Sequence, residues 1–325
     1  MIISQTPLRV SFFGGGTDLR AFYERHGGAV LSTAIDRSVY VVVKRRFDSQ
    51  IRVSYTKTEV VRSVDEIQHD LVREAMRVAG IESGIEIVTL ADVPSEGTGL
   101  GSSSSLTVGI LNALYTYKGE HPSTEQLARL ACQIEIETLS QPIGKQDQYI
   151  AAYGGLRHIK FHADGSTECL VPSSTVETKE SLGARLLAFY TGNVRSSESI
   201  LTRQSADTDV NVPILLQMRE QVSRALDLLA SGEADQFGRL LDVAWQFKKT
   251  LATGITNSGV DRMYERAMDA GALGGKLAGA GGGGFLILYV PLAAQQAVRR
   301  ALSEYQELPL HMEARGTRII LDSGH

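Results

Sequence analysis

The sequence predicts a globular protein of mixed strands and helices, divided into two domains. The chain has 325 residues, and a typical size of roughly 150 residues per domain favours two domains over one. Strand-like and helix-like patterns alternate through residues 1–170, and a polar stretch without periodicity, residues 171–184, then leads into a mainly helical second half. We therefore expect one domain over residues 1–175 and another over residues 176–325.

The first clear elements are expected between residues 39 and 94. Residues 39–47 and 50–55 are rich in β-branched and aromatic side chains, which favours strands. Residues 63–80 have the spacing of an amphipathic helix that Gly80 closes. Residues 84–94 alternate apolar and polar side chains, which is typical of a half-buried strand.

Two helices and a hairpin are expected next. Residues 106–119 are apolar almost all round, which predicts a buried helix. Residues 124–139 predict a further helix, and residues 156–171 predict a hairpin that turns at an Ala-Asp-Gly sequence. The aperiodic stretch at residues 171–184 is the expected linker.

The second half is expected to be mainly helical. Residues 185–192 predict a strand, and residues 212–250 predict a helix in two pieces that breaks near residues 231–235. Residues 261–271 predict another helix. Residues 276–290 join a glycine-rich loop to a strongly apolar strand.

Composition argues against several classes of protein. The net charge of −4 is not that of a nucleic-acid-binding protein, which normally presents a basic face. The two cysteines are too few for a disulfide framework, which favours a reducing compartment. The sequence shows neither a signal peptide nor an apolar run of about 18 residues that could span a membrane. We expect a cytoplasmic protein without a nucleic-acid or membrane partner, and a homodimer is left open.

Glycine is unusually abundant and clustered. The chain has 32 glycines among its 325 residues, against a usual share of about 7%. Residues 279–284 satisfy the GxGxxG pattern, but they precede a strand instead of opening a helix, which argues against a dinucleotide site. The Gly-Lys pairs at residues 144–145 and 275–276 lack the Ser or Thr of a Walker loop. The HRD and DFG motifs of protein kinases are absent from the sequence.

The stretch PSEGTGLGSSSS, residues 94–105, lies between an expected strand and an expected helix. Glycines let the backbone come close to a phosphate. The free N–H groups of the first helical turn and the positive end of the helix dipole attract an anion. The serines could cap the helix or bind phosphate and magnesium. The alternative is a serine-capped helix that follows a flexible turn.

Three motifs together resemble those of the GHMP kinases, the family of galactokinase, homoserine kinase, mevalonate kinase and phosphomevalonate kinase. Residues 94–103 resemble the PxxxGLGSS pattern, with four residues instead of three between Pro94 and Gly99, and a motif like PxRxxxxGxxTD is met by residues 7–18. The glycine motif of the family's C-terminal half is met by residues 276–285. The three motifs occur in the family's order and span nearly the whole chain.

The resemblance implies an α+β fold in two parts. The N-terminal part would contain a left-handed βαβ crossover, and the C-terminal part would be ferredoxin-like. ATP would bind with its phosphates on the PxxxGLGSS loop, and the C-terminal glycine loop would close near the active site. The expected nucleotide-binding residues are Pro94, Gly97, Gly99, Leu100, Gly101, Ser102, Ser103 and Ser104.

The resemblance also implies catalytic residues. Asp147, in the sequence QPIGKQDQY, is the expected base or electrostatic anchor for the sugar hydroxyl, and a helix-capping aspartate is the alternative. Arg9, in the first motif, would bridge Asp147 and the γ-phosphate.

Magnesium would be held by a carboxylate and a serine. Glu135 lies twelve residues before Asp147, as in galactokinases. Glu137 lies about 200° further round the helix, so the two glutamates cannot both face the metal. Among the serines we favour Ser103, while Ser102 and Ser104 stay open.

The expected substrate is a sugar phosphate. Galactokinases have Glu-His where this chain has Gly15-Gly16, and the three motif regions look instead like those of bacterial D-glycero-D-manno-heptose 7-phosphate kinases, with fucokinases as nearer relatives than galactokinases. The implied reaction phosphorylates the anomeric hydroxyl and gives the 1,7-bisphosphate for nucleotide-activated heptose synthesis. The candidate substrate-binding residues are Gly15, Gly16, Thr17, Asp18, Lys145, Arg195, Gly281 and Gly282, with Arg20 as a further candidate for the substrate phosphate.

Two alternatives stay open. The chain could be another small-molecule kinase, such as a fucokinase or an N-acetylhexosamine kinase. It could also be a non-catalytic sugar sensor on the same scaffold, although the joint presence of Arg9, Glu135 and Asp147 speaks against this.

Overall fold

The first half is built on a mixed β-sheet. The computed structural model describes residues 1–94, 97–192 and 197–324. The strands of this sheet follow the order β11-β1-β2-β5-β3-β4, β6 also pairs with β2, and β7 pairs with β6. The bounds of these strands are β1 Ile2–Phe13, β2 Gly28–Arg45, β3 Ile51–Ser54, β4 Thr58–Val61, β5 Ile85–Ala91, β6 Leu156–Phe161, β7 Thr167–Leu170 and β11 Arg318–Asp322.

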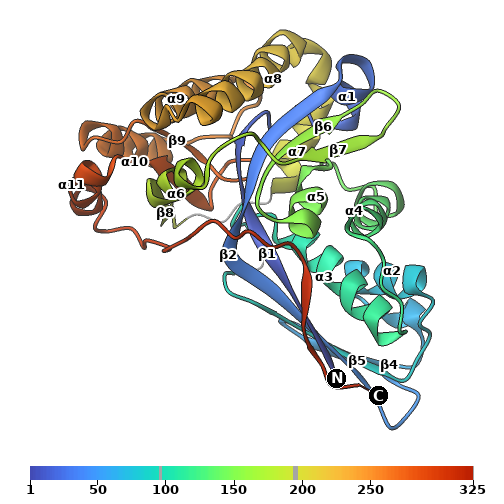
Figure 1. Cartoon of the computed structure of the whole chain (residues 1–325). Coiled ribbons are helices and arrows are strands. Elements are labelled where there is room, and N and C mark those ends of the chain that lie inside the picture. Colours follow the sequence, from blue (N-terminus) through green and yellow to red (C-terminus); the bar gives the residue numbers. More distant parts are fainter. Residues whose placement is uncertain (95–96, 193–196, 325) are drawn as a thin grey trace.

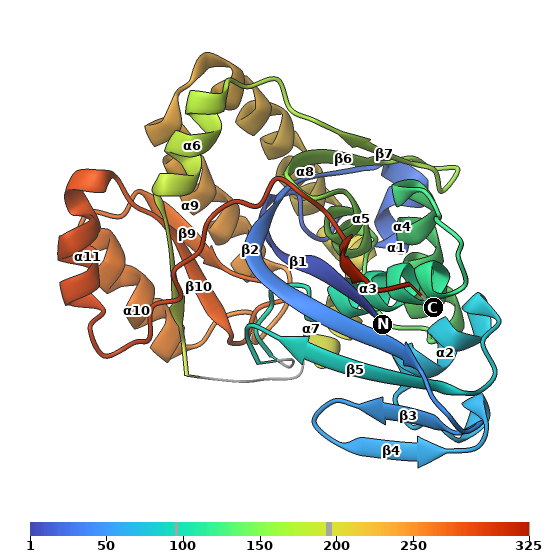
Figure 2. The ribbon, with the colours of Figure 1, turned by 60° about the horizontal axis from the view of Figure 1, so that its bottom comes forward.

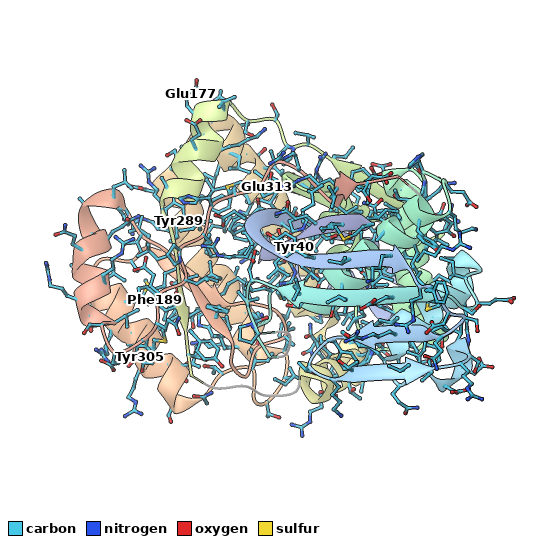
Figure 3. All side chains as sticks on the ribbon, turned by 90° about the horizontal axis from the view of Figure 1, so that it is seen from below. Tyr40, Glu177, Phe189, Tyr289, Tyr305 and Glu313 are labelled. Atoms are coloured by element: carbon cyan, nitrogen blue, oxygen red, sulfur yellow. The ribbon has the colours of Figure 1, made fainter. Side chains whose placement is uncertain are left out.

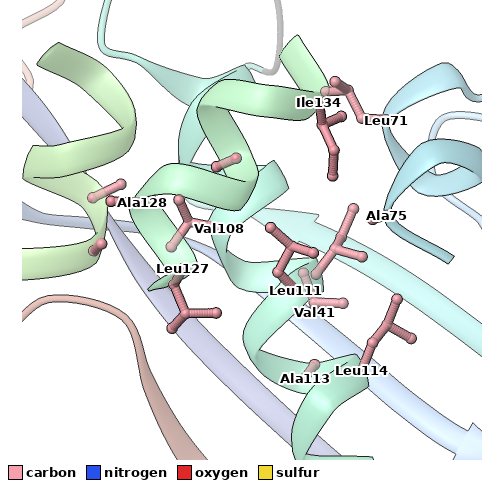
Figure 4. Packing of buried hydrophobic residues seen from close by; sticks show 14 of the residues in the cluster. Val41, Leu71, Ala75, Val108, Leu111, Ala113, Leu114, Leu127, Ala128 and Ile134 are labelled. Atoms are coloured by element: carbon pink, nitrogen blue, oxygen red, sulfur yellow. The ribbon is translucent and has the colours of Figure 1, made fainter. Parts of the chain in front are cut away.

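Helices cover one face of this sheet (Figure 1). Their bounds are α1 Arg20–His26, α2 Asp70–Ala79, α3 Ser102–Tyr117, α4 Thr124–Cys132 and α5 Gln146–Tyr153. Helix α3 is buried as its apolar sequence predicts, and Leu111 lies close to Val41 of β2 in the packed layer that also contains Ala75 of α2 (Figure 4). Helix α3 is therefore fixed along its length, and its first turn is held at the edge of this core.

The second half contains a smaller sheet of β8 (Leu186–Tyr190), β10 (Phe285–Tyr289) and β9 (Gly274–Leu277), in that order. An isolated bridge between Phe189 and Glu307 adds one residue pair beyond β8. This arrangement is the four-strand order of a ferredoxin-like unit, with the fourth strand reduced to a single bridge. Its helices are α6 Val176–Ala184, α7 Ser197–Ala206, α8 Thr208–Ser231, α9 Ala234–Thr250, α10 Ser258–Asp269 and α11 Gln295–Ala301. The expected α+β fold in two parts is confirmed.

The two halves share a hydrophobic core. Phe237 of α9 packs edge-on against Phe12 and Phe13 of β1, with ring centroids 5.4 and 5.0 Å apart. Tyr289 of the second sheet belongs to the same cluster, and its ring centroid lies 6.1 Å from that of Phe237. Figure 3 shows Tyr289 and Phe189 in the second sheet, beside the longer strands that carry Tyr40. The site described below lies where these two sheets meet.

The end of the chain returns to the first half. The backbone N–H of Glu313 donates to Ala34 of β2 at 2.9 Å, and β11 pairs antiparallel with β1. The two termini consequently lie side by side (Figure 1). The expected division near residue 175 stays a prediction, since residues 311–322 pack on the first half.

Several expected boundaries differ in the structure. The expected linker at 171–184 contains a helix, α6, because Thr175 caps it by accepting a hydrogen bond from the Thr178 N–H at 3.1 Å. The helix expected at 63–80 begins only at Asp70, after a short 3₁₀ turn. Strand β2 starts at Gly28, eleven residues before the expected strand. The break between α8 and α9, near Gly232, is confirmed. None of the described helices combines the length and the apolar character needed to cross a membrane.

Candidate active site

A pocket lies at the junction of the two halves. It is lined by residues from β1 and the loop after it, the start of α5, α7, α9, β9 and the second glycine loop. These residues are Arg9, Ser11, Gly15, Gly16, Asp18, Leu19, Ile143, Gly144, Gln146, Asp147, Leu201, Gln204, Lys248, Lys276, Gly279 and Ala280. Figure 2 shows β1 and β2 running between the α3–α5 helices and the second sheet, where this junction lies.

An ion pair between Arg9 and Asp147 lies in the pocket. The Arg9 Nε donates to Asp147 Oδ1 at 2.7 Å, and Nη2 donates to Oδ2 at 2.6 Å. The Arg9 Nη1 donates to the carbonyl of Gly99. The Arg9 side chain is 6% exposed and that of Asp147 is 22% exposed. The bidentate geometry fixes the carboxylate, and its partial exposure leaves it accessible to a bound hydroxyl group.

The first turn of α3 is shaped to receive an anion. Gly101 precedes the helix with a φ of 79°, and no side chain caps the helix there. The first N–H groups of an α-helix have no partner within the helix. They are free to bind the negatively charged oxygens of a phosphate.

The two glycine loops pack backbone against backbone. Gly99 has a φ of 73°, and a Cβ atom added to it would lie 2.4 Å from the carbonyl oxygen of Ala278. A Cβ on Gly284 would lie 2.5 Å from the carbonyl oxygen of Thr98. The Phe285 N–H also donates to Thr98 at 3.3 Å. The second loop is therefore in direct contact with the first, and both contacts require glycine.

Glu135 lies buried behind the first loop. It belongs to a π-helical turn, Gln133–Thr138, that continues α4; such turns often occur at functional sites. Burial raises the pKa of Glu135 to about 7, although Gln148 donates a hydrogen bond to Oε2 at 2.7 Å. The hydroxyls of Ser104 and Ser103 also lie near enough to lower this pKa in part.

The surroundings of Glu135 suit a magnesium ion. Its Oε1 and the Ser104 Oγ are buried without a hydrogen-bond partner. Magnesium in proteins is commonly bound by one or two carboxylates together with phosphate oxygens of the substrate. Among the described residues no cluster of three acidic, cysteine or histidine side chains is poised for a metal. The oxygens of Glu135 and a serine therefore fit a metal that a bound phosphate completes. Glu137 is exposed.

Asp18 is held rigidly at the edge of the pocket. Its carboxylate accepts hydrogen bonds from the Gly16 N–H at 2.9 Å and from the Gln146 N–H at 3.4 Å. Burial and the charge of Asp147 raise the pKa of Asp18. A Cβ on Gly144 would lie 2.0 Å from Asp18 Oδ2, so this approach requires glycine.

Several expected substrate residues lie elsewhere. The Lys145 ammonium donates to the Gly165 carbonyl at 2.8 Å and lies over the Tyr23 ring, away from the pocket. The Thr17 hydroxyl is bonded to the backbone of Gly14 and Ala29. Arg20 is exposed and pairs with Glu24.

The remaining expected residues are near the loops or outside the described chain. Gly281 and Gly282 contact the Ile255 backbone, while their neighbours Gly279 and Ala280 line the pocket. Pro94 is exposed at the end of the described segment. Arg195 lies outside the described residues.

Sequence reasoning missed two buried lysines, Lys248 and Lys276. Lys248 lies in α9, and the sequence around it shows only the periodicity of a helix, which does not mark the lysine as a binding residue. Lys276 is the first residue of the second glycine motif, and a lysine inside a glycine-rich motif is a signal for an anion site that the sequence contains. Both side chains line the pocket together with Arg9.

Comparison with known proteins identifies two related domains. Residues 61–155 match the N-terminal domain of GHMP kinases, and residues 225–308 match the C-terminal domain of GHMP kinases. The two matches occur in the family's order and together cover more than half of the chain.

Individual relatives agree with these matches. The chain is 26% identical to a D-glycero-alpha-D-manno-heptose 7-phosphate kinase of Campylobacter jejuni, over 94% of each chain. It is 27% identical to an L-fucokinase/L-fucose-1-P guanylyltransferase of Bacteroides fragilis, over 94% of this chain and 36% of that larger protein. A D-glycero-D-manno-heptose 1-phosphate kinase from Bacteroides thetaiotaomicron has the same fold, with a TM-score of 0.82, 22% identity and full coverage of both chains.

Proposed function

This chain belongs to the GHMP kinase family, and we propose that it phosphorylates the anomeric hydroxyl of D-glycero-D-manno-heptose 7-phosphate. As a member of this family it is a phosphotransferase whose acceptor is an alcohol group. The product is the 1,7-bisphosphate, an intermediate suited to nucleotide-activated heptose synthesis. The observation that carries the choice of sugar is the match to the Campylobacter jejuni kinase over 94% of both chains. The family uses ATP as the phosphate donor.

Asp147 and Arg9 perform the central step. Asp147 accepts the proton of the anomeric hydroxyl as its oxygen attacks the γ-phosphorus of ATP. An anomeric hydroxyl is more acidic than an ordinary alcohol, so a carboxylate is a sufficient base. Arg9 holds the carboxylate through two hydrogen bonds and brings positive charge to the transferring group.

The first glycine loop and α3 bind the nucleotide phosphates. The N–H groups of residues 102–104 face the phosphate oxygens, and Gly101 lets the backbone turn into the helix. Glu135 and a serine, Ser103 or Ser104, hold magnesium. When bound, the ion neutralises charge on the phosphate oxygens.

Asp18 and Gly15-Gly16 receive the sugar. The Asp18 carboxylate accepts hydrogen bonds from sugar hydroxyls. Gly15 leaves room beside it, since a Cβ added there would meet nothing closer than 3.8 Å, whereas a Cβ added to Gly16 would lie 2.4 Å from Gln204 Nε2. Since Lys145 and Arg20 have partners away from the pocket, neither is kept as a ligand for the substrate phosphate. Arg195 stays a candidate from the sequence alone.

The proposal is tested by ADP release with a panel of sugars. D-glycero-D-manno-heptose 7-phosphate is compared with fucose, galactose and mannose, each with ATP and magnesium. We expect the largest kcat/KM for the heptose phosphate. A larger kcat/KM for an unphosphorylated sugar would contradict the proposed substrate.

An L-fucose kinase is the second candidate. It is favoured by the 27% identity to the Bacteroides fragilis fucokinase, which covers as much of this chain as the heptose kinase match does. The same catalytic residues would serve both sugars. The sugar panel decides between the two candidates. An L-fucose kinase would have its largest kcat/KM with fucose, which carries no phosphate and therefore needs no cation to bind a substrate phosphate.

A further inference from the structure

Two buried lysines in the pocket form no direct ion pair with a carboxylate in the described part of the chain. Lys248 is 7% exposed and Lys276 is 5% exposed. The Lys276 ammonium donates to the Phe12 carbonyl at 3.1 Å. The Lys248 ammonium donates to the carbonyls of Leu277, at 3.0 Å, and Gly279. Among the described residues, no ion pair includes either lysine.

These ammonium groups are incompletely satisfied. An ammonium group carries three donors, and the described acceptors account for one donor of Lys276 and two of Lys248. A buried charge without a counterion is unfavourable. Burial and the charge of Arg9 lower the pKa of Lys276 to about 7, although the negative charge of Asp18 opposes this shift. Burial and the charges of Lys276 and Arg9 lower the pKa of Lys248.

The position of the two lysines indicates which anion would accept their remaining hydrogen bonds. Lys248 donates to the backbone of residues 277–279, the segment that packs against Gly99 of the first glycine loop. Arg9 reaches the carbonyl of Gly99 and the carboxylate of Asp147. The three cations therefore line one pocket together with Asp147, and Arg9 and Lys248 also bind the backbone where the two glycine loops meet.

We propose that Lys248 and Lys276 bind the phosphoryl group that passes from ATP to the sugar. This inference rests on the proposed kinase function and adds a second pair of phosphate ligands, supplied by the C-terminal half. In the step, the bond from the γ-phosphorus to the bridging oxygen breaks, a bond to the sugar oxygen forms, and ADP leaves. The hydroxyl proton goes to Asp147, and the lysines transfer no proton.

The chemistry of the step explains why cations are needed there. In phosphoryl transfer, negative charge is spread over the three equatorial oxygens of the moving group, and catalysis depends mainly on positioning and charge stabilisation. Ammonium groups held by backbone carbonyls need little rearrangement when the charge develops.

The test compares ATP with ADP in lysine variants, by isothermal titration calorimetry with magnesium and without sugar. In Lys276→Met we expect ATP to bind at least ~10-fold more weakly, since hydrogen bonds to charged groups are lost, while ADP binds within about 2-fold of the wild-type value. The control is Lys249→Met, the neighbour of Lys248 on α9, whose ammonium lies 5.9 Å from the Trp245 ring centre. Both nucleotides should bind this variant as they bind the wild type.

Other outcomes overturn the inference. Equal loss of ATP and ADP binding would indicate a general disturbance of the loops. Unchanged binding of both, with a raised KM for the sugar phosphate, would assign the lysines to the substrate's own phosphate. Because the titrations contain no sugar, they do not depend on which sugar is the substrate.

A folding control and a proton measurement sharpen the test. Trp245 is the one tryptophan in the sequence and is fully buried beside Lys248, so its fluorescence reports the state of this region. Lys276→Met must keep the wild-type spectrum, and Lys276→Arg must recover part of the ATP affinity. At pH 8, a bound γ-phosphate raises the lysine pKa, so wild-type protein takes up protons with ATP. Absence of a difference in proton uptake between wild type and Lys276→Met would contradict the inference.

Discussion

At the residue scale, the Arg9–Asp147 pair is the centre of the proposed mechanism. Replacing Asp147 by asparagine keeps the shape of the side chain and removes its ability to accept the hydroxyl proton. We expect kcat to fall by at least ~100-fold while ATP affinity stays near the wild-type value. ADP release gives kcat, and calorimetry gives the affinity.

A distant aspartate serves as the control for this substitution. Asp164 is exposed at the turn between β6 and β7, where its carboxylate accepts from the N–H and the hydroxyl of Ser166. Asp164→Asn should leave kcat unchanged. Turnover of Asp147→Asn within a few-fold of wild type would remove Asp147 from the proposed step.

Glu135 gives a prediction about stability and pH. Its pKa is raised from 4.5 to about 7, so the folded protein binds more protons than the unfolded chain between these values, and stability falls as pH rises through them. Above pH 7 the destabilisation is complete, and the charged Glu135 carboxylate then lowers the free energy of unfolding by about 3 kcal/mol. In Glu135→Gln the side chain cannot ionise, so this pH-dependent destabilisation is absent. We expect its free energy of unfolding, relative to wild type, to rise from pH 5 to pH 8.

Urea unfolding without magnesium and nucleotide measures this difference. A constant difference between variant and wild type across pH 5 to 8 would show that Glu135 is charged in the folded state throughout. The same titration predicts that the magnesium affinity increases from pH 6 to pH 8, because a deprotonated carboxylate is the metal ligand.

The sequence was most informative for residues that lie within motifs. Arg9 and Asp147 lie in separate motifs, and the structure joins them by two hydrogen bonds. Lys145, two residues before Asp147, was predicted to bind the substrate, but its ammonium lies over the Tyr23 ring and donates to the Gly165 carbonyl. Side-chain direction at a helix start depends on tertiary neighbours, which a local pattern does not contain. For the same reason Lys248 was missed.

At the element scale, the contact between the glycine loops should be sensitive to one methyl group. In Gly99→Ala the new Cβ would lie 2.4 Å from Ala278 O, while in Gly119→Ala it meets nothing within 4 Å. The φ angles, 73° and 78°, are nearly the same. Backbone strain of about 1–2 kcal/mol is therefore common to both variants, and the clash belongs to Gly99→Ala alone.

We expect Gly99→Ala to lower the melting temperature more than Gly119→Ala does and to weaken ATP binding. Gly119→Ala should bind ATP normally. Thermal unfolding and nucleotide titration measure the two effects. Equal behaviour of the two variants would mean that the loops do not touch as described.

Elements with strong periodicity were predictable, and elements held by contacts at a distance were not. Helix α3 and the break between α8 and α9 follow from local patterns. Helix α6 was missed because residues 176–184 show no apolar face, and only Leu182 is buried. Strand β2 begins at Gly28 because pairing with β6, over residues 28–33, extends it beyond the β-branched run.

At the scale of the whole molecule, the shared core couples the two halves. Phe237 packs on Phe12 and Phe13, and β11 pairs with β1. Thr317 adds side-chain hydrogen bonds to Thr6 at 2.8 Å and to Asn112 at 3.1 Å. We therefore expect one cooperative unfolding transition in calorimetry, with equal calorimetric and van't Hoff enthalpies.

Two well-separated transitions would contradict this coupling. Phe237→Ala is the matched perturbation, because it removes the aromatic contacts between the halves without touching the pocket. We expect a loss of about 3–5 kcal/mol in the free energy of unfolding. The return of β11 to β1 was not predictable, since strands at opposite ends of a chain carry no local sign of their pairing.

The most direct test of the central claim follows the phosphorus atoms. Phosphorus NMR of ATP, magnesium and D-glycero-D-manno-heptose 7-phosphate with the wild-type protein should show a new phosphate ester on the anomeric carbon, appearing as ADP appears. Asp147→Asn should show it at least ~100-fold more slowly. Phosphate on another hydroxyl, or ATP left unchanged by the wild-type protein, would contradict the account.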